Sequence, residues 1–237
     1  MKVAIVNTLK DGRPQYRLGD AVLMRHTGFG RKAFAFIADN AHLFQRSVGV
    51  EYARSIDRDN PAPQWEVLEE VVRRRCSELD LELPRDDELV VHLRMGDVKG
   101  FKLRAEMLVE YIEKSISRLE SPIRQVTVVT ALHYGRSVLE NELTESKLQD
   151  AISGELGKIE KVLGLFVESG LQARLHSHDD IDRDFCFLAN ARTLVLGNGH
   201  FSACAALVSR ARCFIPPWAR SGTEVDIDAL LAARPRL

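Results

Sequence analysis

The stretch Glu88-Leu89-Val90-Val91-His92-Leu93-Arg94-Met95-Gly96-Asp97 decides the fold class. A run of β-favouring apolar residues follows polar sequence and ends at a glycine, which indicates a buried strand. Because side chains alternate along a strand, His92 and Arg94 share one face. In an open parallel sheet, ligands bind beyond the carboxyl ends of the strands, where the charged fork of an arginine suits phosphate oxygens. The structural alternative is a core histidine followed by an arginine that reaches solvent.

Strand and helix patterns alternate through the second half of the chain. Apolar, β-favouring runs at residues 125–130, 171–175 and 193–196 predict strands. Helical spacing predicts one helix that ends near residue 119 and further helices over residues 140–167, 181–191 and 203–208. The first of these helices is expected to place on one side Met107, Leu108, Tyr111, Ile112 and Ile116. Such alternation is typical of a doubly wound α/β protein with a parallel sheet.

The first half opens with a short predicted strand at residues 3–6. A clear amphipathic helix follows at residues 65–79, with Leu68, Val71 and Val72 at helical spacing. Its consecutive arginines at positions 73–75 point in different directions, so we interpret them as a solvated face. We expect a boundary between two lobes after this helix, with residues 1–85 in the first lobe and 86–237 in the second.

The composition describes a chain that can bury a substantial core. Its 237 residues are 45% hydrophobic and 28% charged, and the formal net charge is −1. That balance argues against a nucleic-acid partner, and no apolar run is long enough to span a membrane. The four cysteines form no CxxC pair and lie in apolar settings, which is typical of free thiols in a reducing compartment. We therefore expect a cytoplasmic protein.

Two further stretches have polar patterns that suit a binding site. Residues 176–184 hold two histidines and four aspartates, which we interpret as a loop and an Asp-capped helix start rather than as a metal site. Residues 197–202, Gly197-Asn198-Gly199-His200-Phe201-Ser202, join a predicted strand to a predicted helix. A tight glycine turn that leads into a helix N-terminus favours an anion such as phosphate. Its alternative is a tight turn required by packing.

Together these stretches resemble the fucosyltransferase superfamily, which includes α1,2-, α1,6- and protein O-fucosyltransferases. The segment His92-Leu93-Arg94-Met95-Gly96-Asp97 is similar to that superfamily's HxRxGD-type motif. The segment from Asp184 to Ser202 is similar to its second motif, in which an Asp-started helix leads to a strand and a small-residue turn. The resemblance covers the second half of the chain. It implies a GT-B-type fold of two Rossmann-like lobes and an inverting glycosyltransferase that needs no metal or other cofactor.

The resemblance also implies roles for individual residues. Arg94 would bind the β-phosphate of a GDP-sugar donor, with GDP-fucose as the expected donor. His92 and Asp184 would recognise the guanosine. The pyrophosphate would be held by the turn residues Asn198, Gly199, His200, Phe201 and Ser202. The first lobe would face a carbohydrate acceptor.

Other assignments remain open on the sequence. A base must remove a proton from the acceptor hydroxyl, and Asp97, Asp20 and Asp11 are candidates. Asp20 is better explained as a helix N-cap. The segment Arg17-Leu18-Gly19-Asp20 resembles the Gly-Asp loop of heptosyltransferase-like GT-B enzymes, so another nucleotide sugar is an alternative donor. A non-catalytic nucleotide- or glycan-binding module is a further alternative. The sequence does not indicate an oligomeric state.

Overall fold

The structure is a computed structural model that describes most of the chain from residue 37 onward. The described residues are 7–8, 14–15, 37–43, 46–57, 59–60, 64–94, 105–119, 122–130, 145–178, 180–197, 200–209 and 211–220. The predicted strand at residues 3–6 lies outside them. So do three candidate bases, Asp11, Asp20 and Asp97, and two turn residues, Asn198 and Gly199.

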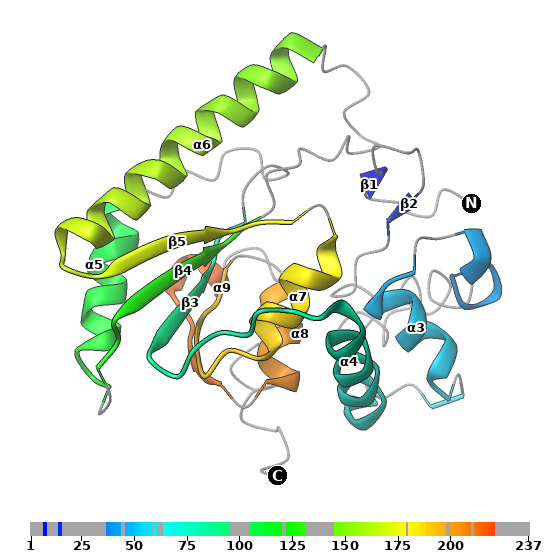
Figure 1. Cartoon of the computed structure of the whole chain (residues 1–237). Helices are drawn as coiled ribbons and strands as arrows, with labels where there is room; N and C mark the ends of the chain where they lie inside the picture. The colour runs from blue at the N-terminus through cyan, green and yellow to red at the C-terminus, as the bar shows by residue number, and fades with distance from the viewer. Residues whose placement is uncertain are drawn as a thin grey trace.

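A five-stranded sheet lies at the centre of the described part of the chain (Figure 1), and all of its strands are parallel. Its order is β5-β4-β3-β6-β7. The bounds are β3 (Glu88–His92), β4 (Gln125–Val129), β5 (Gln172–His176), β6 (Thr193–Val195) and β7 (Arg212–Phe214). This confirms the predicted α/β class with a parallel sheet. A separate antiparallel pair is formed by β1 (Asn7–Thr8) and β2 (Pro14–Gln15).

Helices cover both faces of the sheet. On one face lie α5 (Ala105–Ile116) and α6 (Glu145–Glu168), with α9 (Pro217–Arg220) nearby. On the other lie α4 (Trp65–Leu79), α7 (Ile181–Ala189) and α8 (His200–Val208). The helix α3 (Val48–Ser55) packs against α4, and a 3-10 turn, η1 (Ala41–Leu43), precedes it. Because both faces of the sheet are covered, every residue of β3 and β4 is buried, including the polar residues Glu88, His92, Gln125 and Thr127.

Two hydrophobic cores follow from this layering. Leu89 and Val91 of β3 pack with β4, α5 and α6, whereas Val90 packs with α4, α7 and α8 on the opposite face. All three side chains are fully buried. The alternation of side chains along one strand thus supplies both cores.

Local sequence patterns predicted most of these elements. The helix α4 has the predicted bounds. The bounds of β3, β4, β5 and β6 lie within the predicted strand ranges or extend past them by one residue. The prediction for α5 was wrong at Met107, which is 49% exposed, and the buried positions there include Val109 and Ser115 instead. Six short elements, β1, β2, η1, α3, β7 and α9, were not predicted.

The described part of the first lobe packs directly on the second. Ile37, Tyr52 and Leu68 belong to the same core as Phe185 and Leu188 of α7. The helix α3 packs on α4, and α4 packs on α7 and α8, which cover the sheet. The division into lobes at residues 1–85 and 86–237 stays a prediction. No helix in the described ranges combines the length and apolarity needed to cross a membrane.

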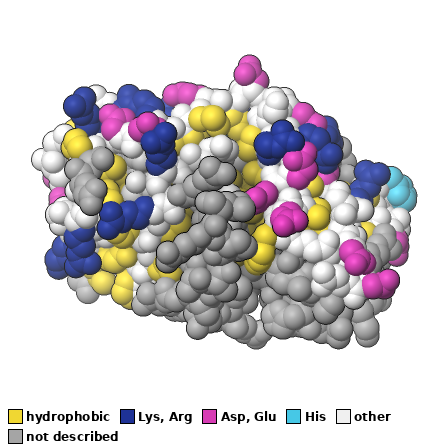
Figure 2. All heavy atoms as spheres, turned by 90° about the horizontal axis from the view of Figure 1, so that it is seen from below, with side chains coloured by type: hydrophobic (Ala, Val, Ile, Leu, Met, Phe, Trp, Pro, Cys, Tyr) yellow, Lys and Arg dark blue, Asp and Glu magenta, His cyan; other side chains and the backbone are white. Residues whose placement is uncertain are grey.

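Charged side chains of both signs are interspersed on the face shown in Figure 2. This mixture fits the formal net charge of −1. The protein therefore lacks an overall charge that would attract a polyanion, and any anion site must depend on a local cluster of cationic groups.

Candidate nucleotide-binding site

The strand order places a topological switch point between β3 and β6, which is where doubly wound proteins have their ligand crevice. From β3 the chain moves outward through α5 to β4 and through α6 to β5. It then returns through α7 to β6, on the other side of β3, and continues through α8 to β7. The helices α5 and α8, which follow β3 and β6, pack on opposite faces of the sheet. Ligands of doubly wound proteins bind at this switch point.

Two predicted site residues, His92 and Arg94, lie at the end of β3, next to this switch point. His92 is the last residue of β3 and is buried. Leu93 continues the ladder, since its N–H donates to the carbonyl of Val129 at 2.9 Å. Arg94 follows as a half-buried residue beyond the strand end. The structure thus places Arg94 where the sequence predicted it, at the carboxyl edge of the sheet.

The turn after β6 packs tightly against the end of β3. A Cβ atom at Gly197 would lie 2.4 Å from His92 Nδ1 and 2.6 Å from the His92 carbonyl oxygen. The N–H of Gly197 donates to Ser202 Oγ at 3.1 Å, so the hydroxyl closes the turn. Ser202 is fully buried. Both residues therefore have a packing role in the described structure, which was the alternative interpretation of this turn.

Aromatic contacts connect the turn to the neighbouring elements. The ring of Phe201 lies 5.6 Å from that of His92 and 5.4 Å, edge to face, from that of Phe185. Phe201 therefore fixes the first turn of α8 between β3 and α7. Backbone N–H groups in that turn have no partner within the helix, so the N-terminus of α8 is a positive pole beside the switch point.

We expect Gly197→Ala to lower the free energy of unfolding by roughly 1–3 kcal/mol or more, because the added carbon meets backbone that cannot move aside. Urea unfolding followed by circular dichroism measures this loss. Gly157→Ala is the control, since a Cβ at that position of α6 meets nothing within 4 Å. That variant should gain about 0.5–1 kcal/mol. Equal stability of Gly197→Ala and the wild type would mean that the two strand ends are further apart.

The loop with two histidines contains a buried pair of titratable groups. Asp184 Oδ1 lies 3.5 Å from His176 Nε2. Among the described residues neither atom has a hydrogen-bond partner, and the His176 ring stacks on Phe187 at 3.9 Å. Burial raises the pKa of Asp184 to about 8 and lowers the pKa of His176 to about 4. At pH 7 this pair is therefore a neutral carboxyl beside a neutral imidazole.

Asp180 and Asp182 of this loop have structural partners. Asp180 caps α7 by accepting a hydrogen bond from the N–H of Asp182. Asp182 in turn binds the Nε of Arg75 at 2.7 Å. The described residues contain no cluster of three metal-ligating side chains. The capped helix start that the sequence predicted is confirmed.

Sequence reasoning missed one polar residue at the same edge, Thr130, and placed His176 in the acidic loop rather than at a strand end. His176 ends β5, and Thr130 follows β4 with a buried hydroxyl that has no partner within the described residues. The N–H of Thr130 donates to the carbonyl of His176 at 3.3 Å. Their position directly after predicted strands was the available signal, because every parallel strand ends at this edge.

The strand order defines a doubly wound α/β arrangement with its switch point between β3 and β6. Comparison of the chain with protein-family models, with curated proteins and with solved structures finds no match.

Proposed function

We propose that this protein is an inverting glycosyltransferase that moves L-fucose from GDP-fucose to a glycan acceptor. The proposal is supported by one observation above all. The end of β3 with Arg94 and the turn after β6 are about 100 residues apart in the sequence, and each was predicted to bind phosphate. They lie at neighbouring strand ends because β3 pairs directly with β6. Arg94 and the N-terminus of α8 then lie on the two sides of this switch point.

The expected chemistry needs positive charge at this position. Sugar transfer passes through an oxocarbenium-like state while negative charge grows on the departing diphosphate. A fixed arginine and a helix N-terminus stabilise that charge more in the transition state than in the ground state. No metal is required for this stabilisation. The acceptor hydroxyl would lose its proton to Asp97 or Asp20, both of which lie outside the described residues.

The finer fold belongs to the same proposal. In a GT-B arrangement, residues 86–237 would form the donor lobe around the parallel sheet, and residues 1–85 would form a second Rossmann-like lobe on the acceptor side. The sheet order in the donor lobe is compatible with this arrangement. His92 and Asp184 would recognise the guanosine, and the turn at residues 198–202 would hold the pyrophosphate.

Nucleotide binding tests the proposal. We expect GDP, at a hundred times its Kd, to add about 2.7 kcal/mol of stability without divalent metal, and UDP, ADP and dTDP to add less. A thermal-shift panel of the four nucleotides measures this. If EDTA abolishes the GDP effect, a metal participates and residues 176–184 should be reconsidered as its site. Hydrolysis of GDP-fucose without acceptor would separate an enzyme from a binding module, and equal shifts by all four nucleotides would contradict the donor assignment.

The protonation of Asp184 adds a pH dependence to this test. The guanine edge presents two N–H donors, which a carboxylate accepts and a protonated carboxyl does not. Because burial raises the pKa of Asp184 to about 8, GDP must displace a proton at pH 7. GDP affinity should therefore rise with pH from 6 to 8, by up to about tenfold per pH unit. Asp184→Asn should bind GDP more weakly and lose this dependence; an unchanged profile would leave Asp184 as a helix residue only.

A further inference from the structure

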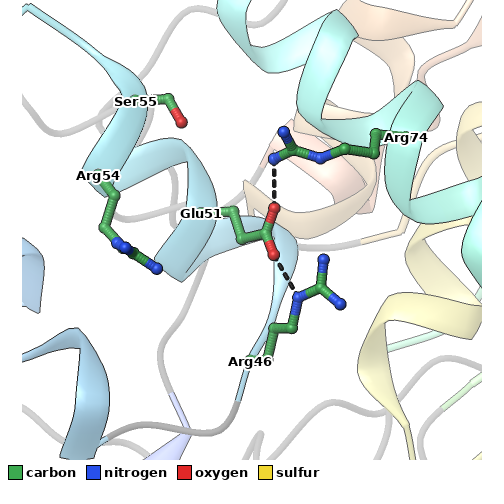
Figure 3. A pocket seen from close by; sticks show the side chains of 5 residues that line it. All are labelled: Arg46, Glu51, Arg54, Ser55 and Arg74. Atoms are coloured by element: carbon green, nitrogen blue, oxygen red, sulfur yellow. Dashed lines mark hydrogen bonds and ion pairs between the residues drawn. The ribbon is translucent and has the colours of Figure 1, made fainter.

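A polar pocket lies away from the sheet edge, between α3 and α4 (Figure 3). Its volume is about 550 Å³, within the range of small-molecule sites. The described residues that line it are Arg46, Glu51, Arg54, Ser55 and Arg74. They come from the segment before α3, from α3 itself and from α4. Three arginines and one glutamate leave two net positive charges around the pocket.

Glu51 holds two of the arginines in place. Arg46 Nε and Arg74 Nη2 each donate to a different oxygen of the Glu51 carboxylate, and Arg46 Nη2 also donates to Glu78 at 2.8 Å. The Glu51 side chain is only 13% exposed. Although burial disfavours its charge, the hydrogen bonds from Arg46 and Arg74 hold the pKa of Glu51 below its ordinary value. Glu51 is therefore a permanent anion that orients two guanidinium groups at neutral pH.

The donors of these guanidinium groups are not all used. Arginine has five N–H donors, and Arg74 uses one nitrogen for Glu51. Arg54, in the last turn of α3, makes no hydrogen bond or ion pair with any described residue. In Figure 3, Arg54 and Ser55 lie on the other side of Glu51 from Arg74. Arg54, which has no partner among the described residues, thus lines the same pocket as two arginines that Glu51 already fixes.

We propose that this pocket binds a small molecule that carries a phosphomonoester, such as a sugar phosphate. Guanidinium groups bind phosphate oxygens through paired hydrogen bonds, and the lining residues carry an excess of positive charge that favours a dianion even though Glu78 already pairs with Arg46. Because Glu51 fixes Arg46 and Arg74 in advance, binding orders only Arg54 and the ligand. The pocket also has room for more than a phosphate group. None of its residues belongs to the sheet, so this inference does not depend on the proposed glycosyltransferase activity.

Calorimetric titration at constant ionic strength tests the proposal, with glucose 6-phosphate as the probe and glucose and inorganic phosphate as comparisons. We expect saturable binding of glucose 6-phosphate, no binding of glucose and weaker binding of inorganic phosphate. Arg54→Gln should weaken glucose 6-phosphate about tenfold or more, as loss of a charge-assisted hydrogen bond does. It leaves the contacts of Glu51 intact, so its melting temperature should stay that of the wild type.

Arg73→Gln is the matched control. Arg73 precedes Arg74 on α4, but it is exposed, pairs with Glu70 and does not line the pocket. Its replacement removes the same charge and should leave the Kd unchanged. Equal weakening by Arg73→Gln and Arg54→Gln would reduce the effect to general electrostatics and overturn the site. Absence of saturable binding would overturn it as well, and equal affinity for inorganic phosphate would overturn the assignment to a phosphomonoester.

Discussion

Arg75→Ala is expected to lower the free energy of unfolding by about 3 kcal/mol. Its Nε lies 2.7 Å from Asp182 Oδ2, and the Asp182 side chain is only 3% exposed. Removal of the arginine leaves this carboxylate buried without its counter-charge. The loss should fall at the lower end of the range for broken buried pairs, because Asp182 keeps a hydrogen bond from the N–H of Val48 at 3.0 Å. Chemical denaturation measures it.

A control for Arg75→Ala is available on the same helix. Arg73 pairs with Glu70, and both side chains are more than half exposed. Arg73→Ala should therefore unfold at the wild-type denaturant concentration, since exposed pairs contribute little. The double replacement Arg75→Met with Asp182→Leu should recover much of the lost stability, because no buried charge then remains unpaired. If Arg75→Ala is as stable as the wild type, the contact between α4 and α7 does not depend on this ion pair.

Arg94→Ala is expected to remove most sugar transfer. If Arg94 stabilises the departing diphosphate as a preorganised donor, its loss should cost roughly 3–4 kcal/mol in the transition state. Arg94→Lys keeps the charge but loses the planar fork, so it should bind GDP weakly and transfer slowly. Transfer from GDP-fucose, GDP affinity and melting temperature should be measured on the same preparations.

Arg192→Ala is a suitable control for Arg94→Ala. Arg192 directly precedes β6, so it lies at the opposite, amino edge of the sheet, and it is exposed and paired with Asp86. Its replacement removes one positive charge without reaching the switch point, and transfer should be unchanged. Wild-type transfer by Arg94→Ala, together with a lower melting temperature, would make Arg94 a structural residue at the strand end. The proposed donor site would then be wrong.

The elements that were predicted well depend on local patterns. The bounds of α4 follow from apolar residues at helical spacing, and β3 and β4 follow from apolar runs that both cores require. The strand β7 was missed although β6, which is equally short, was predicted, because only two of its three residues, Cys213 and Phe214, are apolar. Met107 was misplaced because the pattern allows more than one apolar stripe on α5, and only packing against α6 selects one.

The consecutive arginines at positions 73–75 illustrate a different limit. The sequence indicated a solvated face, but each arginine has its own partner and the Arg75 side chain is only 13% exposed. Arg73 binds Glu70 of the same helix, Arg74 reaches Glu51 of α3, and Arg75 binds Asp182 of α7. Two of these partners are distant in sequence, so no local pattern could identify them.

By itself the sequence determined the α/β class, the order of its strands and helices along the second half, and the two polar stretches that frame the candidate site. These depend on side-chain periodicity and turn residues, which act over a few positions. Only the tertiary structure decided that β6 pairs with β3, that Gly197 packs on His92, and that Asp184 is buried beside His176. Such contacts join residues that are 8 to more than 100 positions apart, and they arise from the burial of both faces of one sheet.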